Sequence, residues 1–235
     1  MILNTLYKIA LFICLLFIVS CSSDINSNTE NTEPKNYKYL ALGDSYTIGQ
    51  SVCESCRFPI QLQDSISKYI DDIDTFQTKI IAQTGWTTSN LKSAITSQNP
   101  PNDYDLVTLL IGVNNQYQNT PFNVFEQEFP ELVSTAIEKA KGKKENVIVV
   151  SIPDYAFTPF GDGNTSISTQ IDDYNAFAEN YCNTNNITFV NITDITRLGL
   201  AQTNLVATDS LHPSKIAYTK FVERILPKAK IKLGL

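Results

Sequence analysis

A serine near the start of the chain and a histidine near its end are the residues whose side chains could exchange a proton in catalysis. Ser45 lies in the segment Gly43-Asp44-Ser45-Tyr46, and His212 is the only histidine among 235 residues. Because imidazole is the side chain that accepts and returns a proton near neutral pH, a serine hydrolase built on this chain must use His212 as its base. Asp209, three residues before His212, is close enough to orient one ring nitrogen and leave the other facing Ser45. The three residues therefore predict a nucleophilic triad.

The elements that must position these residues are predicted from the hydrophobic pattern. Short, almost wholly apolar runs predict five buried strands, at residues 37–42, 79–82, 106–111, 147–152 and 187–192. Helical spacing predicts helices between them, at residues 58–70, 89–95, 122–141 and 171–181, and a last helix from Pro213 to about Leu226, with Pro227 near its end. This alternation predicts a three-layer α/β/α sandwich with a mostly parallel five-stranded sheet.

Three candidate site residues each follow a predicted strand. Ser45, Gly85 and Asn114 come just after the first, second and third strands. Because ligands of open parallel sheets bind outside the carboxyl ends of the strands, we expect the three to converge at one edge of the sheet. His212 precedes Pro213 and is therefore expected in a loop rather than inside a helix.

Four blocks of the sequence, taken in order, resemble those of the SGNH, or GDSL-type, hydrolase superfamily. They are Gly43-Asp44-Ser45, the lone Gly85, Gly112-x-Asn114 and Asp209-x-x-His212. The resemblance extends from about residue 37 to residue 226 and implies the flavodoxin-like fold of that superfamily. It implies Ser45 as nucleophile, His212 as general acid and base, and Asp209 as the residue that orients His212. It also implies an oxyanion hole formed by the N–H groups of Ser45 and Gly85 and the side-chain amide of Asn114, with neither a cofactor nor a metal.

One residue departs from the pattern of the superfamily. Asn115 stands where an aspartate commonly follows the asparagine of the third block. Since that position is not assigned the proton transfer, we expect altered local hydrogen bonding rather than lost chemistry. Asp44 is expected to hold the serine loop in shape, not to act directly in catalysis.

The function expected from these residues is hydrolysis of small acyl esters through an acyl-enzyme, with carbohydrate O-acyl esters and lysophospholipid-like esters as candidate substrates. Aromatic residues near the predicted site are candidates for a rim around the serine, with packing as the alternative: Trp86, Tyr155, Phe157 and Phe160. Two rival hypotheses stay open. One is a non-catalytic lipoprotein of the same fold that binds an envelope glycan, and the other is a thiol-redox centre at Cys53 and Cys56.

The N-terminal residues differ in composition from the rest of the chain. Lys8 precedes an apolar run at residues 9–19, and Ile18-Val19-Ser20-Cys21 resembles the lipobox of bacterial lipoproteins. This predicts a signal peptide at residues 1–20, a lipidated Cys21, a flexible tether at residues 21–36 with a reach of about 20 Å, and a hydrolase domain at residues 37–235. Ordinary secretion and an N-terminal membrane anchor are the alternatives. The expected location is the bacterial cell envelope, on the periplasmic side or the outer surface.

The net charge bears on the class of binding partner, and the cysteine spacing bears on disulfide formation. Without Lys8 the chain has 17 basic and 24 acidic residues, a formal charge of −7, which argues against nucleic acid as a partner. We expect a monomer that meets a small acyl ester and reaches the membrane through its lipid. Cys53-Glu54-Ser55-Cys56 is expected to close a disulfide ring, with free thiols and redox or zinc chemistry as alternatives.

Overall fold

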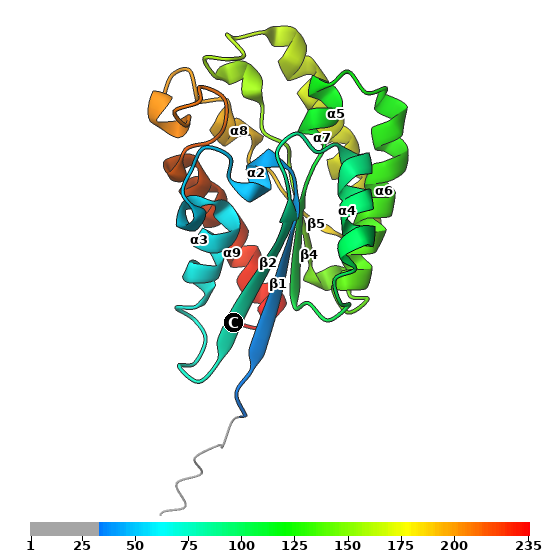
Figure 1. Ribbon diagram of the computed structural model, residues 1–235, viewed down its shortest axis with the longest axis vertical. Helices are drawn as coiled ribbons and strands as arrows, with labels where there is room; N and C mark the ends of the chain where they lie inside the picture. The colour runs from blue at the N-terminus through cyan, green and yellow to red at the C-terminus, as the bar shows by residue number, and fades with distance from the viewer. Residues whose placement is uncertain (1–32) are drawn as a thin grey trace, which may run out of the picture. The chain divides into compact units, whose positions relative to one another are not determined.

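Five parallel strands form one sheet at the centre of the computed structural model, which describes residues 33–235 (Figure 1). The strands are β1 (Asn36–Gly43), β2 (Thr75–Ala82), β3 (Leu106–Leu110), β4 (Val147–Val150) and β5 (Thr188–Val190). Their order across the sheet is β2-β1-β3-β4-β5. Gly43 at the end of β1 is level with Ala82 of β2 and Leu110 of β3. The carboxyl ends of these three strands therefore end side by side.

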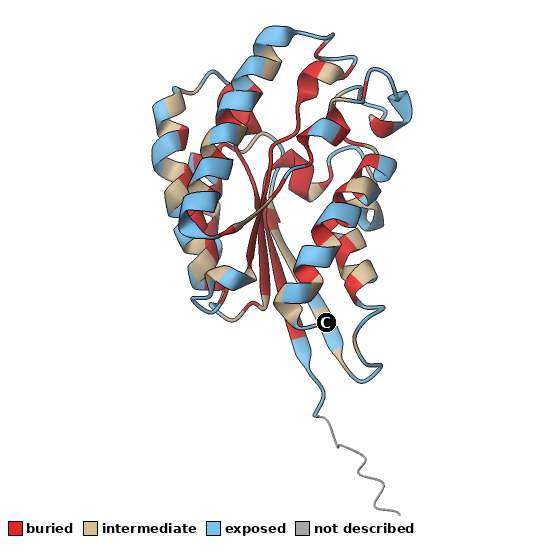
Figure 2. Cartoon of the chain, turned by 180° about the vertical axis from the view of Figure 1, so that it is seen from behind, coloured by how far each residue is buried: buried red, intermediate tan, exposed pale blue. Residues whose placement is uncertain are grey.

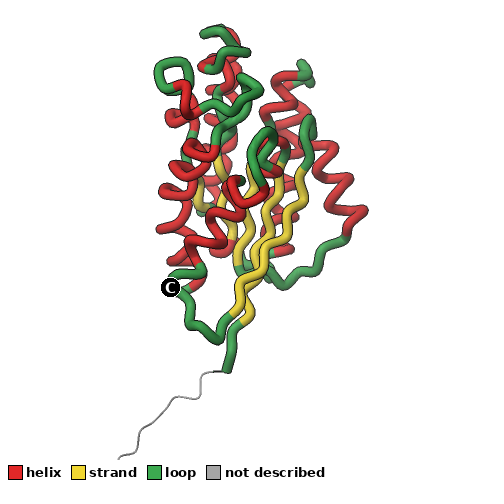
Figure 3. The backbone as a smooth tube through the Cα atoms, turned by 60° about the vertical axis from the view of Figure 1, so that its left-hand side comes forward, coloured by secondary structure: helices red, strands yellow, loops and turns green. Residues whose placement is uncertain are grey.

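Long helices cover both faces of the sheet. Helices α3 (Phe58–Ile66) and α9 (Lys215–Leu233) lie on one face, and α4 (Thr88–Gln98), α6 (Phe122–Lys139) and α7 (Thr165–Asn185) lie on the other (Figures 1 and 3). Every residue of β3 and β4 is buried, as the red strands in Figure 2 show. A strand covered on both faces has apolar residues one after another, and this is why these strands could be predicted from the sequence. The predicted three-layer α/β/α architecture with a parallel five-stranded sheet is confirmed.

Several short elements between the strands and the long helices were not predicted. Helix α2 (Ser45–Ile48) follows β1, α5 (Val113–Tyr117) follows β3, and α8 (Thr193–Thr196) follows β5. Four 3₁₀ turns, at Glu54–Cys56, Lys144–Asn146, Tyr155–Phe157 and Thr203–Leu205, complete the elements of the described chain. Elements of three to five residues are too short to show a helical period, so the sequence pattern had marked them as loops.

The last helix begins and ends later than predicted. It starts at Lys215 rather than at Pro213, because the Ser214 hydroxyl accepts a hydrogen bond from the Ala217 N–H at 3.3 Å and caps the helix. Pro213 instead pairs with Val206 in an isolated antiparallel bridge. The helix then continues through Pro227 to Leu233. Tertiary packing compensates for the missing N–H of Pro227, since Ile225 and Ala229 on either side of it are fully buried.

Other boundaries also moved. Strand β2 begins at Thr75, four residues before the predicted start, and α7 begins at Thr165 with Asn164 as its N-cap. Asn36, expected in the tether, is the first residue of β1 and pairs with Thr75. The exposed ends of these elements carry polar residues, which hid them from a hydrophobic pattern.

Residues Pro34–Leu235 form one compact unit. The predicted signal peptide, the lipidation site at Cys21 and the tether as far as residue 32 lie outside the described residues. In residues 33–235, none of the helices has the length and apolar content that crossing a bilayer requires.

Candidate active site

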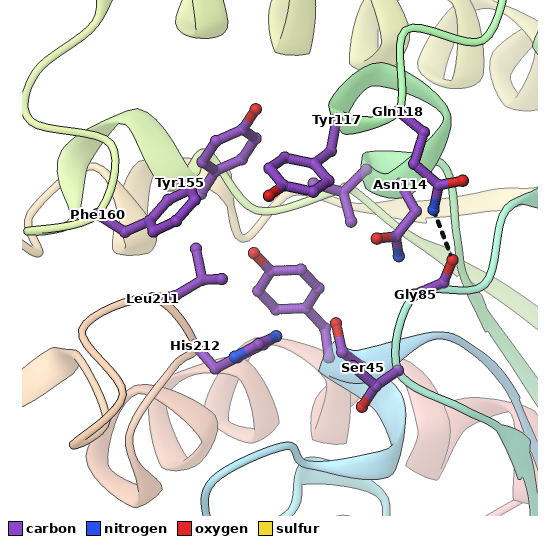
Figure 4. A pocket seen from close by; sticks show the side chains of 12 residues that line it. Ser45, Gly85, Asn114, Tyr117, Gln118, Tyr155, Phe160, Leu211 and His212 are labelled. Carbon is purple, nitrogen blue, oxygen red and sulfur yellow. Dashed lines mark hydrogen bonds between the residues drawn. The ribbon is translucent and has the colours of Figure 1, made fainter.

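A pocket of about 210 Å³ opens at the carboxyl edge of the sheet, and Ser45, Gly85, Asn114 and His212 all line it (Figure 4). The other lining residues are Tyr46, Thr84, Val113, Tyr117, Gln118, Tyr155, Phe160 and Leu211. The structure thus brings together four candidate residues from four separate segments of the chain. Asp209 lies behind His212 rather than in the pocket wall, bonded to the imidazole ring.

Ser45 is the first residue of α2, directly after β1. The chain turns so tightly here that a Cβ on Gly43 would lie 2.1 Å from Thr47 Oγ1 and 2.4 Å from the Leu110 carbonyl oxygen. Only glycine fits at that position. Ser45 is 3% exposed, and within the described residues its backbone N–H donates to no other group. The first N–H groups of a helix lack intrahelical acceptors, so this one is free to bind an anion.

Asp44 holds the serine loop through its fully buried carboxyl group. Its Oδ1 accepts from the Tyr46 N–H at 3.0 Å, and its Oδ2 accepts from Asn114 Nδ2 at 3.4 Å. Burial raises the pKa of Asp44 to about 7, against the lowering effect of these two hydrogen bonds. Asp44 therefore holds the serine loop, the role expected from the sequence, and also links that loop to Asn114.

His212 and Asp209 share one short loop. Asp209 Oδ2 lies 2.6 Å from His212 Nδ1, and Asp209 Oδ1 accepts the backbone N–H of His212 at 2.9 Å. The loop closes on itself because the Ala207 N–H donates to the His212 carbonyl at 2.7 Å. Burial raises the pKa of Asp209, but hydrogen bonds from Ser51 and from the backbone and ring of His212 outweigh it and lower the pKa to about 2. Asp209 is consequently a carboxylate at neutral pH, suited to accept a hydrogen bond from the N–H at Nδ1.

The imidazole of His212 faces Ser45 across the floor of the pocket (Figure 4). The ring packs beside Tyr46, with 5.3 Å between ring centroids and an interplanar angle of 52°. His212 is 7% exposed, so its ring is held between Asp209, Tyr46 and the pocket. Within residues 33–235, the hydrogen-bond partner of the His212 ring is Asp209, and no direct hydrogen bond joins the ring to the Ser45 hydroxyl. Catalytic hydrogen bonds of this kind commonly tighten when substrate binds.

Side-chain amides from α5 hold the loop that contains Gly85. Asn114 Nδ2 donates to the Trp86 carbonyl at 3.1 Å, and Gln118 Nε2 donates to the Gly85 carbonyl at 2.8 Å, the dashed line of Figure 4. Gly85 has a φ of +85°, which favours glycine, and within residues 33–235 its N–H has no acceptor. Within residues 33–235, the N–H groups of Ser45 and Gly85 have no acceptor, whereas Asn114 Nδ2 donates to the Trp86 carbonyl and, over a longer 3.4 Å, to Asp44.

Asn115 is fully buried and makes two hydrogen bonds to Thr88. Its Oδ1 accepts the Thr88 N–H at 3.0 Å, and its Nδ2 donates to the Thr88 hydroxyl at 2.7 Å. That hydroxyl in turn donates to Glu128 at 2.5 Å. The Asn115 amide donates to the Thr88 hydroxyl and so leaves the proton of that hydroxyl to Glu128.

An aromatic wall stands opposite the serine. Tyr117, Tyr155 and Phe160 form a cluster with ring centroids 5.9 to 6.3 Å apart. Tyr155 and Phe160 had been predicted as rim residues, whereas Phe157 is absent from the lining and Trp86 packs against the core. Sequence reasoning missed Tyr117 and Gln118. The signal was their spacing, since residues three and four positions after Asn114 share its face once α5 is recognised as a helix.

Cys53 and Cys56 are joined by a disulfide outside the pocket lining. Cys182 is buried and free, and burial raises the pKa of its thiol to about 12. Within the part of the chain that the structure describes, no three His, Cys, Asp or Glu side chains gather in an arrangement that could hold a metal ion.

Comparison with known proteins agrees with the geometry. Among solved structures, the chain is similar to TesA, with 14% identity and a TM-score of 0.65 over 83% of this chain and 99% of that one. It is similar to the acetyl xylan esterase Axe2 from Geobacillus stearothermophilus and to the lipase/acylhydrolase from Enterococcus faecalis, each with 17% identity and a TM-score of 0.63 over 83% of this chain and 95% of the other. At such identities these likenesses establish the shared fold.

The family of the chain is assigned from its sequence. No curated protein matches the chain. A model of the GDSL-like lipase/acylhydrolase family, however, matches residues 41–220, a range that contains Ser45, Gly85, Asn114, Asp209 and His212. The chain belongs to the GDSL-like lipase/acylhydrolase family.

Proposed function

We propose that the chain is a serine ester hydrolase that works through an acyl-enzyme. Ser45 Oγ attacks the carbonyl carbon of an ester while His212 takes the hydroxyl proton, and the alcohol leaves with that proton. Water, deprotonated by His212, then attacks the acyl-enzyme and releases the acid. The observation that carries this proposal is the Asp209–His212 pair facing Ser45 in a pocket that Gly85 and Asn114 also line.

Asp209 assigns the two ring nitrogens of His212 their roles. With Asp209 ionised, Nδ1 keeps its proton and donates a hydrogen bond to Oδ2, so Nε2 is the nitrogen left to accept a proton from Ser45. The carboxylate also stabilises the imidazolium that forms during each transfer.

The negative charge that develops on the substrate oxygen needs donors fixed in advance. The N–H groups of Ser45 and Gly85 and the amide of Asn114 are assigned this role. The long 3.4 Å hydrogen bond from Asn114 to Asp44 is the one that yields when the oxyanion forms. A single donor in such a site contributes roughly 3 to 4 kcal/mol to the transition state.

The lining of the pocket favours a neutral acyl ester as substrate. Among the described side chains that line it there is no Lys, Arg, Asp or Glu, so a phosphate or carboxylate on the substrate would find no counter-ion there. The aromatic wall offers apolar surface for an acyl group or the face of a sugar. An O-acyl ester of a carbohydrate fits this lining better than a lysophospholipid, and one protein of the same fold, Axe2, is an acetyl xylan esterase.

The test uses the purified protein with p-nitrophenyl acetate and with a fluorophosphonate probe. Turnover and labelling at Ser45 are expected, and both are expected to vanish in folded Ser45→Ala and His212→Ala variants. A non-catalytic glycan-binding protein would give neither turnover nor labelling. A panel of acetylated sugars, lysophospholipids and acyl thioesters then ranks the substrate classes.

We further propose that the enzyme is anchored by a lipid on Cys21 in a bacterial envelope and acts there as a monomer. The support is the lipobox-like segment that ends at Cys21. Metabolic labelling with a fatty acid tests the anchor, since Cys21→Ser should abolish both the label and the membrane fraction. Label retained in that variant would overturn it, and size-exclusion chromatography with light scattering tests the monomer.

A further inference from the structure

A second serine contacts the acid and base of the site. Ser51 Oγ donates to Asp209 Oδ2 at 2.6 Å, across 158 residues of sequence. Within residues 33–235 the other donors to Asp209 are the N–H of Leu211 and the N–H and ring of His212, all in its own loop. Ser51 is therefore the contact that ties Asp209 to the segment of the nucleophile, which ends only two residues earlier at Gly49, the C-cap of α2.

The backbone of Ser51 is held in a conformation that serine does not favour. It occupies the third position of a turn closed by the Val52 N–H and the Gly49 carbonyl at 3.3 Å, and its φ is +64°. Glycine or asparagine is preferred at such a position. A serine that keeps this conformation although its side chain is exposed suggests that the hydroxyl itself is required.

The loop around Ser51 is braced on both sides. The Cys53–Cys56 disulfide closes the segment that follows it, and Gly49 packs so closely on Arg57 that an added Cβ would lie 2.5 Å from the Arg57 Cβ. Gln61 Nε2 donates to the Cys56 carbonyl at 2.6 Å and lies 3.3 Å from the Lys215 carbonyl, at the start of α9. The loop is thereby fixed relative to the start of α9, the helix that follows the Asp209–His212 loop.

We propose that Ser51 is a positioning residue for the proton-transfer pair. Its hydroxyl fixes the Asp209 carboxylate relative to α2, so that the His212 ring is aimed at Ser45. Oδ2 receives both Ser51 Oγ and His212 Nδ1, so loss of the hydroxyl leaves this oxygen held only by the loop that carries His212. The proposal rests on the function proposed above for Ser45, Asp209 and His212.

Ser51→Gly and Ser51→Asn make a matched pair of variants. Both residues tolerate a positive φ, but only asparagine keeps a side-chain donor. Ser51→Gly should fold at least as stably as the parent and should lower kcat about tenfold, the effect of ~1.4 kcal/mol, with KM unchanged. Ser51→Asn should retain most of the activity. Ser55→Ala, in the same loop but without a contact to Asp209, is the control.

A double-mutant cycle and a spectroscopic readout complete the test. If Ser51 acts through Asp209, Ser51→Gly should cost nothing further in an Asp209→Ala background. Because the untagged chain has a single histidine, the Nδ1 proton of His212 gives one assignable NMR signal, which should shift in Ser51→Gly and not in Ser55→Ala.

The outcomes separate this proposal from the function it rests on. An unchanged kcat together with an unchanged His212 signal in Ser51→Gly would overturn it. Equal losses of kcat in Ser51→Gly and Ser51→Asn would also overturn it. So would a Ser51→Gly substitution that lowers kcat as much in the Asp209→Ala background as in the parent. An inactive parent protein would overturn the proposed ester hydrolysis, while the His212 signal would still decide whether Ser51 positions the pair.

Discussion

Asp209 binds His212 through both of its carboxylate oxygens. Oδ2 lies 2.6 Å from the ring nitrogen Nδ1, and Oδ1 accepts the backbone N–H at 2.9 Å. A spacing of three residues allows one carboxylate to reach both groups, because the loop returns on itself at Ser210, where φ is +67°. The ring and the backbone that carries it are thus oriented by one side chain.

Asp209→Asn is expected to lower kcat by about 10³ to 10⁴ while the protein stays folded. An amide in place of the carboxylate can donate to Nδ1, which leaves the proton on Nε2, facing Ser45. His212 then cannot accept the serine proton. Steady-state kinetics with p-nitrophenyl acetate measure the effect, and the exposed Asp64→Asn on α3 is the control. Full turnover by folded Asp209→Asn would contradict the role given to Asp209.

Asp44 makes stability depend on pH in the direction opposite to Asp209. Because burial raises the pKa of Asp44 to about 7, its contribution is fully present below about pH 4 and is lost as the pH rises through 7. The contribution of Asp209, whose pKa is lowered to about 2, is present above about pH 4 and is lost as the pH falls toward 2.

Asp44→Asn should therefore remove part of the decline in unfolding free energy between pH 4 and 7. The asparagine carbonyl can still accept from the Tyr46 N–H, so the turn before Ser45 is kept. Urea denaturation of both proteins at pH 4, 5, 6, 7 and 8 gives the comparison. Parallel curves for the two proteins would show that Asp44 does not bind a proton in this range.

Asn115→Asp should destabilise this chain by roughly 1 to 2 kcal/mol. Burial raises the pKa of Glu128, but the hydroxyls of Thr88 and Ser89 outweigh it and lower that pKa below its usual value, so Glu128 is ionised. A second carboxylate at position 115 would compete with it for the Thr88 proton.

A Glu128→Gln background distinguishes competition between two carboxylates for the Thr88 proton from a simple loss of packing at position 115. In a Glu128→Gln background, Asn115→Asp should cost less than it does in the parent, which a double-mutant cycle of chemical denaturation measures. Equal costs in the two backgrounds would mean that the two side chains do not communicate through Thr88.

Gly85→Ala and Gly142→Ala should have similar effects on stability and different effects on catalysis. Both glycines have positive φ, +85° and +71°, and a Cβ added to either would meet no atom within 4 Å. Each substitution should cost about 1 kcal/mol from backbone strain. Only Gly85 lines the pocket, so only its Cβ narrows the space for an acyl group.

Kinetics with acetyl and longer acyl p-nitrophenyl esters separate the two variants. Gly85→Ala should raise KM more for the longer esters, whereas Gly142→Ala should match the parent on all of them. A uniform effect of Gly85→Ala on every ester would place the acyl group elsewhere.

The sequence by itself determined the layers of the fold and the types of residue available for chemistry. Strands such as β3 and β4 are buried on both faces, so their residues must be apolar one after another, and a continuous apolar run is readable without knowing any partner. His212 was identifiable as the one candidate base because the chain has no other histidine. Asp209 was identifiable as its partner because it lies three residues before the sole histidine and the other sequence blocks appear in the expected order.

Only the tertiary structure decided which side chains meet. The contact of Ser51 with Asp209 and the approach of the Asn114 and Gln118 amides to the loop of Gly85 join residues far apart in the chain. Local composition carries no record of such contacts, since Ser51 reads as an ordinary turn residue and Gln118 as an exposed polar one. Their meeting depends on the parallel register that ends β1, β2 and β3 at one level, and that register is a property of the packed sheet rather than of any single segment.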